Sequence, residues 1–187
     1  MKILSALKKI AGILNSTEVS WILAGSTASY LNGLDVEPRD IDILTDQFGA
    51  YIIDREFASK RIKAIKRVGF SETDTYASHF GIFLINDTQV EIIGDLVIKY
   101  KGYLIKVDML GLISNAVEKK IDDSLFLIVP LEWQLVINSI IPGKEDRAEE
   151  IAKHLKQKGI NYNLIENFLT TMPEVVRERV NELLSSY

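Results

Sequence analysis

The chain has 187 residues, of which 47% are hydrophobic and 26% are charged, and its formal net charge is −4. These values predict a soluble protein with one compact domain, or a domain with a small appendage. The modest negative charge excludes bulk electrostatic recruitment of nucleic acid, and the absence of cysteine excludes disulfides, thiolate metal sites and a cysteine nucleophile.

The N-terminal segment "MKILSALKKIAGILN" predicts an amphipathic helix that packs on the domain. Lys8 and Lys9 interrupt its apolar residues, which is not typical of a signal peptide, and no apolar run approaches the ~20 residues that span a membrane. We therefore expect a cytoplasmic protein with no membrane partner. The residues at helical spacing are Ile3, Leu4, Leu7, Ile10, Ala11 and Leu14.

The next elements alternate between strands and helices. In chain order, the pattern predicts a strand over 21–25, a helix over 26–33, a strand over 40–44, a helix with a break over 49–67, and strands over 79–85 and 88–93. Gly69 closes the second of these helices. The polar pair Asn86-Asp87 between the last two strands predicts a hairpin turn.

The remaining chain predicts a short mixed region followed by helices. The expected elements are a strand over 103–107, a helix over 109–120, a strand over 124–129 that ends at Pro130, and helices from Leu131 onward. The fold class is thus α/β (α+β), a mixed β-sheet flanked by helices. We expect a first domain over residues 1–130 and a helical C-terminal region over 131–187 packed on it.

Asp40 and Asp42 lie in "DIDIL", one of the predicted strands. Because side chains alternate across a strand, the two carboxylates share one face about 6.6 Å apart, while Ile41 and Ile43 face the core. At an effective dielectric constant near 20, their repulsion is about 2.5 kcal/mol. Mg²⁺ prefers oxygen ligands and would relieve this repulsion, and two such ions form a clamp used in nucleotidyl transfer.

A third carboxylate is expected from the hairpin. In "TQVEII", Glu91 faces the side opposite to Val90 and Ile92, so it can join the aspartates if the two strands are neighbours. Asp95 and Asp108 remain alternatives for the third position. Neither lies within a predicted strand on the expected face, because Asp95 follows Gly94 and Asp108 follows the strand over 103–107.

Gly25 and Ser26 join the first predicted strand to its helix. A helix that starts there directs free backbone N–H groups and a positive dipole end at an anion. Gly25 would let the backbone approach a phosphate closely, and the Ser26 hydroxyl and amide can donate to phosphate oxygens. The turn is therefore a predicted triphosphate site that faces the acids.

The stretch "LAGSTASYLNGLDVEPRDIDIL" resembles the signature of the DNA polymerase β-like nucleotidyltransferase superfamily in its minimal form. That signature is Gly-Gly or Gly-Ser, then nine to thirteen residues, then Asp-apolar-Asp. The resemblance implies a nucleotidyltransferase-like fold and transfer of a nucleoside monophosphate from an NTP, with two Mg²⁺ ions. It implies that Asp40 and Asp42 hold both metals, that Glu91 completes the coordination shell of the catalytic metal, and that Gly25 and Ser26 bind phosphates.

A second segment, "LEWQLVINSIIPGKEDRAEEIAKHL", is similar to the C-terminal part of these enzymes, and Lys144 matches their lysine. Pro142 and Glu145 stand where arginine and aspartate are usual, which puts the substrate side of the match in doubt. We predict that residues 131–187 form the acceptor-side wall of a cleft. Lys144 would lie at its rim and face the triphosphate or the acceptor.

The acceptor is not readable from the sequence. A small molecule, a protein side chain and an RNA end are all used in this superfamily. The alternative function is a non-catalytic, antitoxin-like protein that binds a protein partner on the same fold. Basic residues in 55–67 are interpreted as a solvated helix face, or else as a stripe for RNA or triphosphate: Arg55, Lys60, Arg61, Lys63, Lys66 and Arg67.

Overall fold

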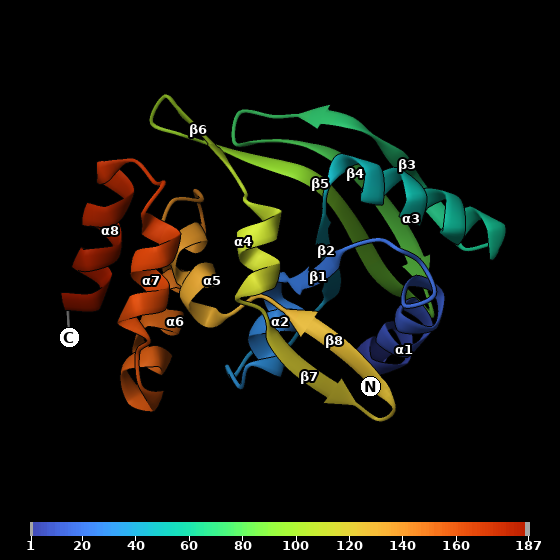
Figure 1. Ribbon diagram of the computed structural model, residues 1–187, viewed down its shortest axis with the longest axis horizontal. Coiled ribbons are helices and arrows are strands. Elements are labelled where there is room, and N and C mark those ends of the chain that lie inside the picture. Colours follow the sequence, from blue (N-terminus) through green and yellow to red (C-terminus); the bar gives the residue numbers. More distant parts are fainter. Residues whose placement is uncertain (1, 186–187) are drawn as a thin grey trace.

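The computed structural model describes residues 2–185 and has a mixed α/β architecture (Figure 1). The helices are α1 (Lys2–Leu14), α2 (Gly25–Leu31), α3 (Gln47–Ser59), α4 (Met109–Ser114), α5 (Leu131–Asn138), α6 (Glu145–Lys158), α7 (Tyr162–Leu169) and α8 (Glu174–Ser185). The strands are β1 (Trp21–Ala24), β2 (Asp40–Thr45), β3 (Lys63–Glu72), β4 (Tyr76–Ile85), β5 (Thr88–Tyr100), β6 (Tyr103–Lys106), β7 (Val117–Ile121) and β8 (Ser124–Ile128).

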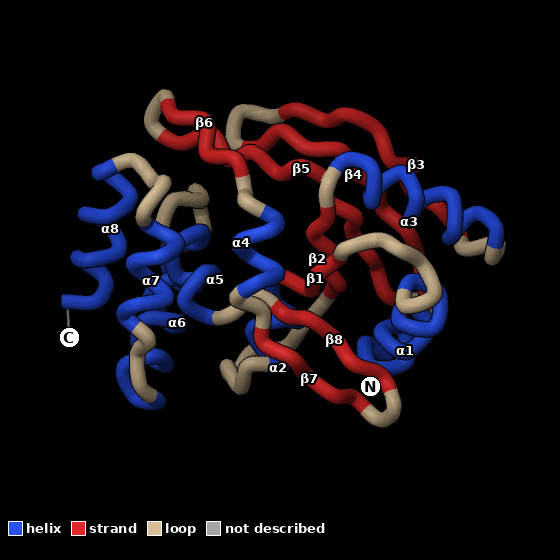
Figure 2. The backbone as a smooth tube through the Cα atoms, in the orientation of Figure 1, coloured by secondary structure: helices blue, strands red, loops and turns tan. Residues whose placement is uncertain are grey.

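The strands form one mixed sheet in the order β3-β4-β5-β2-β1-β8-β7, and β6 pairs with β5. The β2–β5 and β1–β8 pairs are parallel, and the others are antiparallel. Figure 2 shows α1 and α3 at one end of the sheet and α5, α6, α7 and α8 grouped at the other. The predicted fold class is confirmed.

One hydrophobic core joins the N-terminal and C-terminal parts of the described chain. Leu7 of α1, Ile41 of β2, Leu135 of α5 and Val180 of α8 are all fully buried in it. The predicted amphipathic N-terminal helix is confirmed, because its buried residues follow the helical period. None of the helices in residues 2–185 has the length and apolar character needed to cross a bilayer.

The predicted hairpin is also confirmed. β4 and β5 pair as antiparallel strands, and the turn residues Asn86 and Asp87 have positive φ angles of 50° and 61°. Both central residues of a type I′ turn need positive φ, and Asn and Asp tolerate that conformation better than other residues with a Cβ atom.

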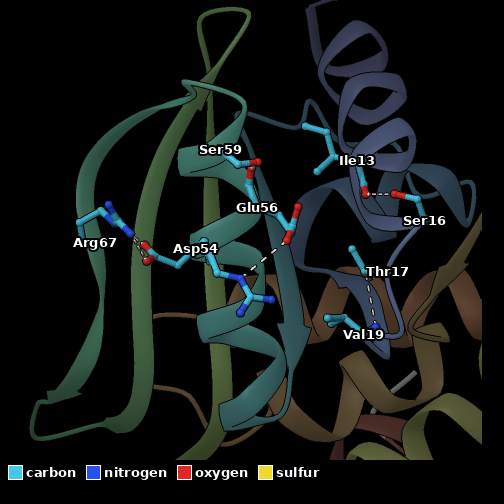
Figure 3. Close-up of polar contacts among 9 residues, drawn as sticks. Ile13, Ser16, Thr17, Val19, Asp54, Glu56, Ser59 and Arg67 are labelled. Carbon is cyan, nitrogen blue, oxygen red and sulfur yellow. Dashed lines mark hydrogen bonds and ion pairs between the residues drawn. The ribbon is translucent and has the colours of Figure 1, made fainter.

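The prediction of helix over residues 49–67 is wrong for its last part. α3 ends at Ser59, the turn residue Arg61 has φ 57°, and residues from Lys63 form the edge strand β3. The Arg67 side chain donates to the Asp54 carboxylate of α3, with Nε 2.6 Å from Oδ1 (Figure 3). Sheet pairing and this ion pair outweigh the local helical pattern, and charged side chains are common on edge strands.

The predicted helix over 109–120 is likewise too long. α4 ends at Ser114, and Val117–Ile121 forms β7, which pairs antiparallel with β8. Side chains of β7 alternate between half-buried and exposed. That alternation has the period of a strand, so the apolar residues at 117 and 121 belong to a hairpin and not to a helix face.

Candidate active site

The predicted acids meet at the centre of the sheet. β2 and β5 are parallel neighbours, and their register places Asp42 opposite Glu91 and Asp40 opposite Gln89. Asp40, Asp42 and Glu91 all line one cavity of about 510 Å³. Ile41 and Ile43 are fully buried on the other face of β2. The strand period thus separates a carboxylate face from a core face, as the sequence predicts.

The Gly25 turn packs directly against Asp42. Gly25 has φ 61°, and a Cβ atom added there would lie 1.7 Å from Oδ2 of Asp42. The Ser26 hydroxyl lies 3.4 Å from Oδ1 of Asp40, and the buried Thr27 hydroxyl donates to the Asp40 backbone oxygen at 2.6 Å. Glycine is therefore needed both for the backbone conformation and for the space that the carboxylate occupies.

The carboxyl groups are close together and partly buried, which favours the protonated form of Asp42. Burial, followed by the charges of Asp40 and Glu91, raises the pKa of Asp42 to about 7, while the Lys144 ammonium opposes this shift. Burial also raises the pKa of Glu91 against the hydrogen bond that Gln89 donates to it at 2.7 Å. The Asp42 and Glu91 carboxyl groups hydrogen bond to each other. This centre has an excess of negative charge that a cation would neutralise.

Cationic side chains approach the acids from α6 and from the residue before it. Lys144 precedes the first residue of α6 and lines the cavity, and its charge acts on both Asp42 and Glu91. Arg147, one turn further along α6, also lines the cavity. The cavity thus has an acidic floor on β2 and β5 and a basic rim on α6.

The sequence profile of the aminoglycoside-2″-adenylyltransferase family matches residues 6–116, more than half of the chain. The chain belongs to this family. The matched segment contains the Gly25 turn, Asp40, Asp42 and Glu91, and ends before Lys144. None of the curated proteins compared with the chain matches it.

Solved structures give the same fold for this family member. A candidate nucleotidyltransferase from Thermotoga maritima is 32% identical, with a TM-score of 0.66, and the match covers 83% of this chain and 94% of that chain. ANT(2″)-Ia in complex with adenylyl-2″-tobramycin is 14% identical, with a TM-score of 0.54 and coverage of 100% and 99%. A lincomycin-bound lincosamide antibiotic adenylyltransferase is 13% identical, with a TM-score of 0.50 and coverage of 78% and 94%. The nucleotidyltransferase fold predicted by resemblance is confirmed.

The two alternative acids lie elsewhere in this family member. Asp95 lies within β5, which extends to Tyr100, and not beyond the strand as the sequence suggested; its φ is 49°, and its carboxylate lies 3.6 Å from the Lys106 ammonium. Asp108 precedes α4, and its carboxylate lies against Gly111. Neither Asp95 nor Asp108 lines the cavity that holds Asp40, Asp42 and Glu91.

The cavity residues that escape prediction from the sequence include Gln134, Arg147 and Tyr76. Over residues 2–185, the buried side-chain nitrogen or oxygen atoms without a hydrogen-bond partner are Nε2 of Gln134 and Nη1 of Arg147. Oε1 of Gln134 accepts from the Ser29 hydroxyl at 2.6 Å, which orients the amide. Both unpartnered groups belong to the cavity wall, so a bound ligand can satisfy them. Sequence spacing carries no signal for either.

The carboxylates of the site do not form a ready metal cage. In the part of the chain that the structure describes, no group of three or more His, Cys, Asp or Glu side chains has the arrangement of a metal site. Asp42 and Glu91 instead share a hydrogen bond. Their oxygen atoms are nonetheless the donor type that Mg²⁺ prefers, and their excess charge suits a divalent cation. The residues therefore fit a metal by donor chemistry and charge.

Proposed function

We propose that this protein transfers a nucleoside monophosphate from an NTP to a hydroxyl group of a small-molecule acceptor, in a reaction that depends on Mg²⁺. The observation that carries the proposal is the parallel register of β2 and β5, which sets Glu91 opposite Asp42 in a cavity shared with Lys144. Membership of an adenylyltransferase family supports the same reaction.

In this proposal Asp40, Asp42 and Glu91 would hold two Mg²⁺ ions, which would supply charge stabilisation for the attacking and leaving oxygens. The raised pKa of Asp42 supports this role, because a carboxyl group that retains a proton near pH 7 has a strong need for a compensating charge. A cation would take the place of that proton.

The chain's own residues bind the triphosphate and move the proton. Ser26 donates its hydroxyl to a phosphate oxygen, and Lys144 and Arg147 offset the charge of the departing pyrophosphate. The acceptor oxygen attacks the α-phosphorus as the bond to the bridging oxygen breaks. Glu91 takes the proton that the acceptor hydroxyl loses.

Small-molecule hydroxyls are the favoured acceptors. The names of the family and of two structural neighbours refer to antibiotics of low molecular weight. A cavity of about 510 Å³ has the size of a small-molecule site. An antitoxin-like partner function has no support from these comparisons.

The test is transfer of label from α-³²P-labelled NTPs to small hydroxyl compounds, total protein and total RNA. Asp40→Asn, Asp42→Asn and Glu91→Gln should each lower Mg²⁺-dependent transfer at least ~100-fold, because each removes a charged metal ligand. Asp95→Asn and Asp108→Asn are the matched controls and should keep wild-type rates. Loss of transfer in a control, with full transfer in Glu91→Gln, would show that Glu91 is not the third carboxylate.

A further inference from the structure

Besides the acids, the cavity is lined by two chemically different groups of residues, which we call its two walls. One wall carries the cations Lys144 and Arg147, and an anionic triphosphate belongs beside it. The second wall comes from β3, β4, β5 and the turn after β3. It contains Ser71, Thr73 and Ser78 and the apolar side chains of Phe80, Ile93 and Leu96, and the Thr73 hydroxyl is hydrogen-bonded within its own turn. The space against this second wall is left for the acceptor, which departs from the sequence-based expectation that residues 131–187 form the acceptor-side wall.

The acceptor wall offers no carboxylate to an ammonium group. All acidic side chains among the cavity-lining residues of the described chain belong to the reacting centre, namely Asp40, Asp42 and Glu91. Glu72, at the end of β3, forms an ion pair with Lys99, whose Nζ lies 2.6 Å from Oε1 of Glu72. Asp74 is exposed in the β3–β4 turn and does not line the cavity.

The charge that lies against this wall is positive. Nζ of Lys66, an exposed residue of β3, lies 5.1 Å from the centre of the Phe80 ring and 3.3 Å from the Ser71 hydroxyl oxygen. A second cation brought to the same wall would be repelled by Lys66. It would also lose its water against Phe80, Ile93 and Leu96 without gaining a counter-charge.

We infer that the acceptor is an uncharged small molecule that combines a reactive hydroxyl group with an apolar or aromatic face, and not a polyamine. The inference rests on the proposed function. The serine and threonine hydroxyls can donate to or accept from neutral hydroxyl and carbonyl groups. Phe80 and Leu96 cover the apolar face, which leaves the reactive hydroxyl directed at Asp42 and Glu91.

The deciding experiment compares two compounds that differ by one ammonium group. Phenyl β-glucoside and its 6-amino-6-deoxy analogue are titrated by saturation-transfer NMR into the full chain loaded with Mg²⁺ and a non-hydrolysable ATP analogue. We expect the neutral glucoside to bind at least tenfold more tightly. Equal or tighter binding of the amine overturns the inference, as does the absence of binding by the neutral compound.

Charge reversal locates the effect on this wall. Lys66→Glu should shift the affinity ratio at least threefold in favour of the amine, because the repulsive charge becomes attractive. Lys63→Glu makes the same charge change at the exposed first residue of β3, at the end of the strand away from Ser71, and should leave the ratio unchanged. An unchanged ratio in Lys66→Glu overturns the assignment of this wall to the acceptor.

Label transfer in parallel reactions separates this inference from the proposed function. Preferential labelling of the amine would refute the neutral acceptor but would support the nucleotidyltransferase reaction. Labelling of RNA or protein in place of small molecules would have the same meaning. A neutral preference in binding with no transfer of label to any compound refutes the transfer reaction, while the chemistry of the wall stands.

Discussion

A methyl group at position 25 would occupy the space of the Asp42 carboxylate. Gly25→Ala places Cβ 1.7 Å from Oδ2 of Asp42, at a φ of 61° that disfavours any L side chain. We expect this variant to lose about 2 to 4 kcal/mol of unfolding free energy in urea. Label transfer should also fall, because Asp42 must move away from Glu91.

Gly33→Ala is the matched control for Gly25→Ala. Gly33 has φ 91°, but no atom lies within 4 Å of an added Cβ, so only backbone strain of about 1 kcal/mol is expected. Equal losses in the two variants would mean that contact with Asp42 contributes nothing to the need for glycine at position 25.

Asp42 makes the stability of the metal-free protein depend on pH. Its pKa is raised from 3.8 to about 7, so between these values the native state holds a proton that the unfolded chain has released. Stability therefore falls as pH rises from about 4 to about 7, by on the order of 2 to 4 kcal/mol, and then levels off. Urea unfolding in EDTA at pH 5 and pH 8 measures this difference.

Asp42→Asn should remove most of that dependence. The variant should exceed the wild type in stability by a larger margin at pH 8 than at pH 5, because the amide carries no charge to be buried. Mg²⁺ should flatten the wild-type profile if the metal replaces the proton. Parallel profiles for the wild type and the variant would contradict the assignment of the proton to Asp42.

Among the secondary-structure elements, α3 and β3 are linked by the ion pair of Asp54 and Arg67 (Figure 3). Burial raises the pKa of Asp54, but hydrogen bonds from Arg67 and from the Val68 backbone N–H outweigh it, so the net pKa is lowered. A lowered pKa contributes stability above the unfolded value of about 4, and this contribution is lost as pH falls below it.

Asp54→Asn should therefore cost about 1 to 3 kcal/mol at pH 7 and progressively less in acid below about pH 4. Urea unfolding at pH 7 and pH 3 provides the comparison. Glu56→Gln is the control on the same helix, because its contact with Arg55 at 3.8 Å involves a largely exposed arginine and should contribute under about 0.5 kcal/mol. A similar loss in both variants would show that the α3–β3 contact is not specific.

At the scale of the whole molecule, the candidate site depends on segments that are distant in sequence. Lys144 from the C-terminal helical part acts on Asp42 of β2 and Glu91 of β5. Lys144→Ala should weaken NTP use by about 1.5 to 3 kcal/mol in kcat/KM if it donates to phosphate. Steady-state kinetics with varied NTP measures this loss.

Lys153→Ala is the control for Lys144→Ala, because Lys153 is exposed on α6 and does not line the cavity. Kinetics that match the wild type in Lys144→Ala would remove the C-terminal segment from the proposed nucleotide site. The arrangement of Gly25, Asp40, Asp42 and Glu91 would be unaffected by that result.

The sequence by itself determined the features that depend on local periods. Alternation in β2 puts Asp40 and Asp42 on one face, and the polar pair at positions 86 and 87 sets the hairpin turn. The spacing from Gly25 to Asp40 was enough to indicate the superfamily. These signals are readable because backbone geometry fixes which side chains share a face.

Only the tertiary structure decided which elements are neighbours. The register of β2 on β5 places Glu91 beside Asp42, whereas Asp95, further along β5, and Asp108 do not line the cavity. Pairing with β4 and β8 turns the segments from 63 and from 117 into strands. Long-range hydrogen bonds and burial outweigh local propensity there, and no local pattern records which distant strand will supply them.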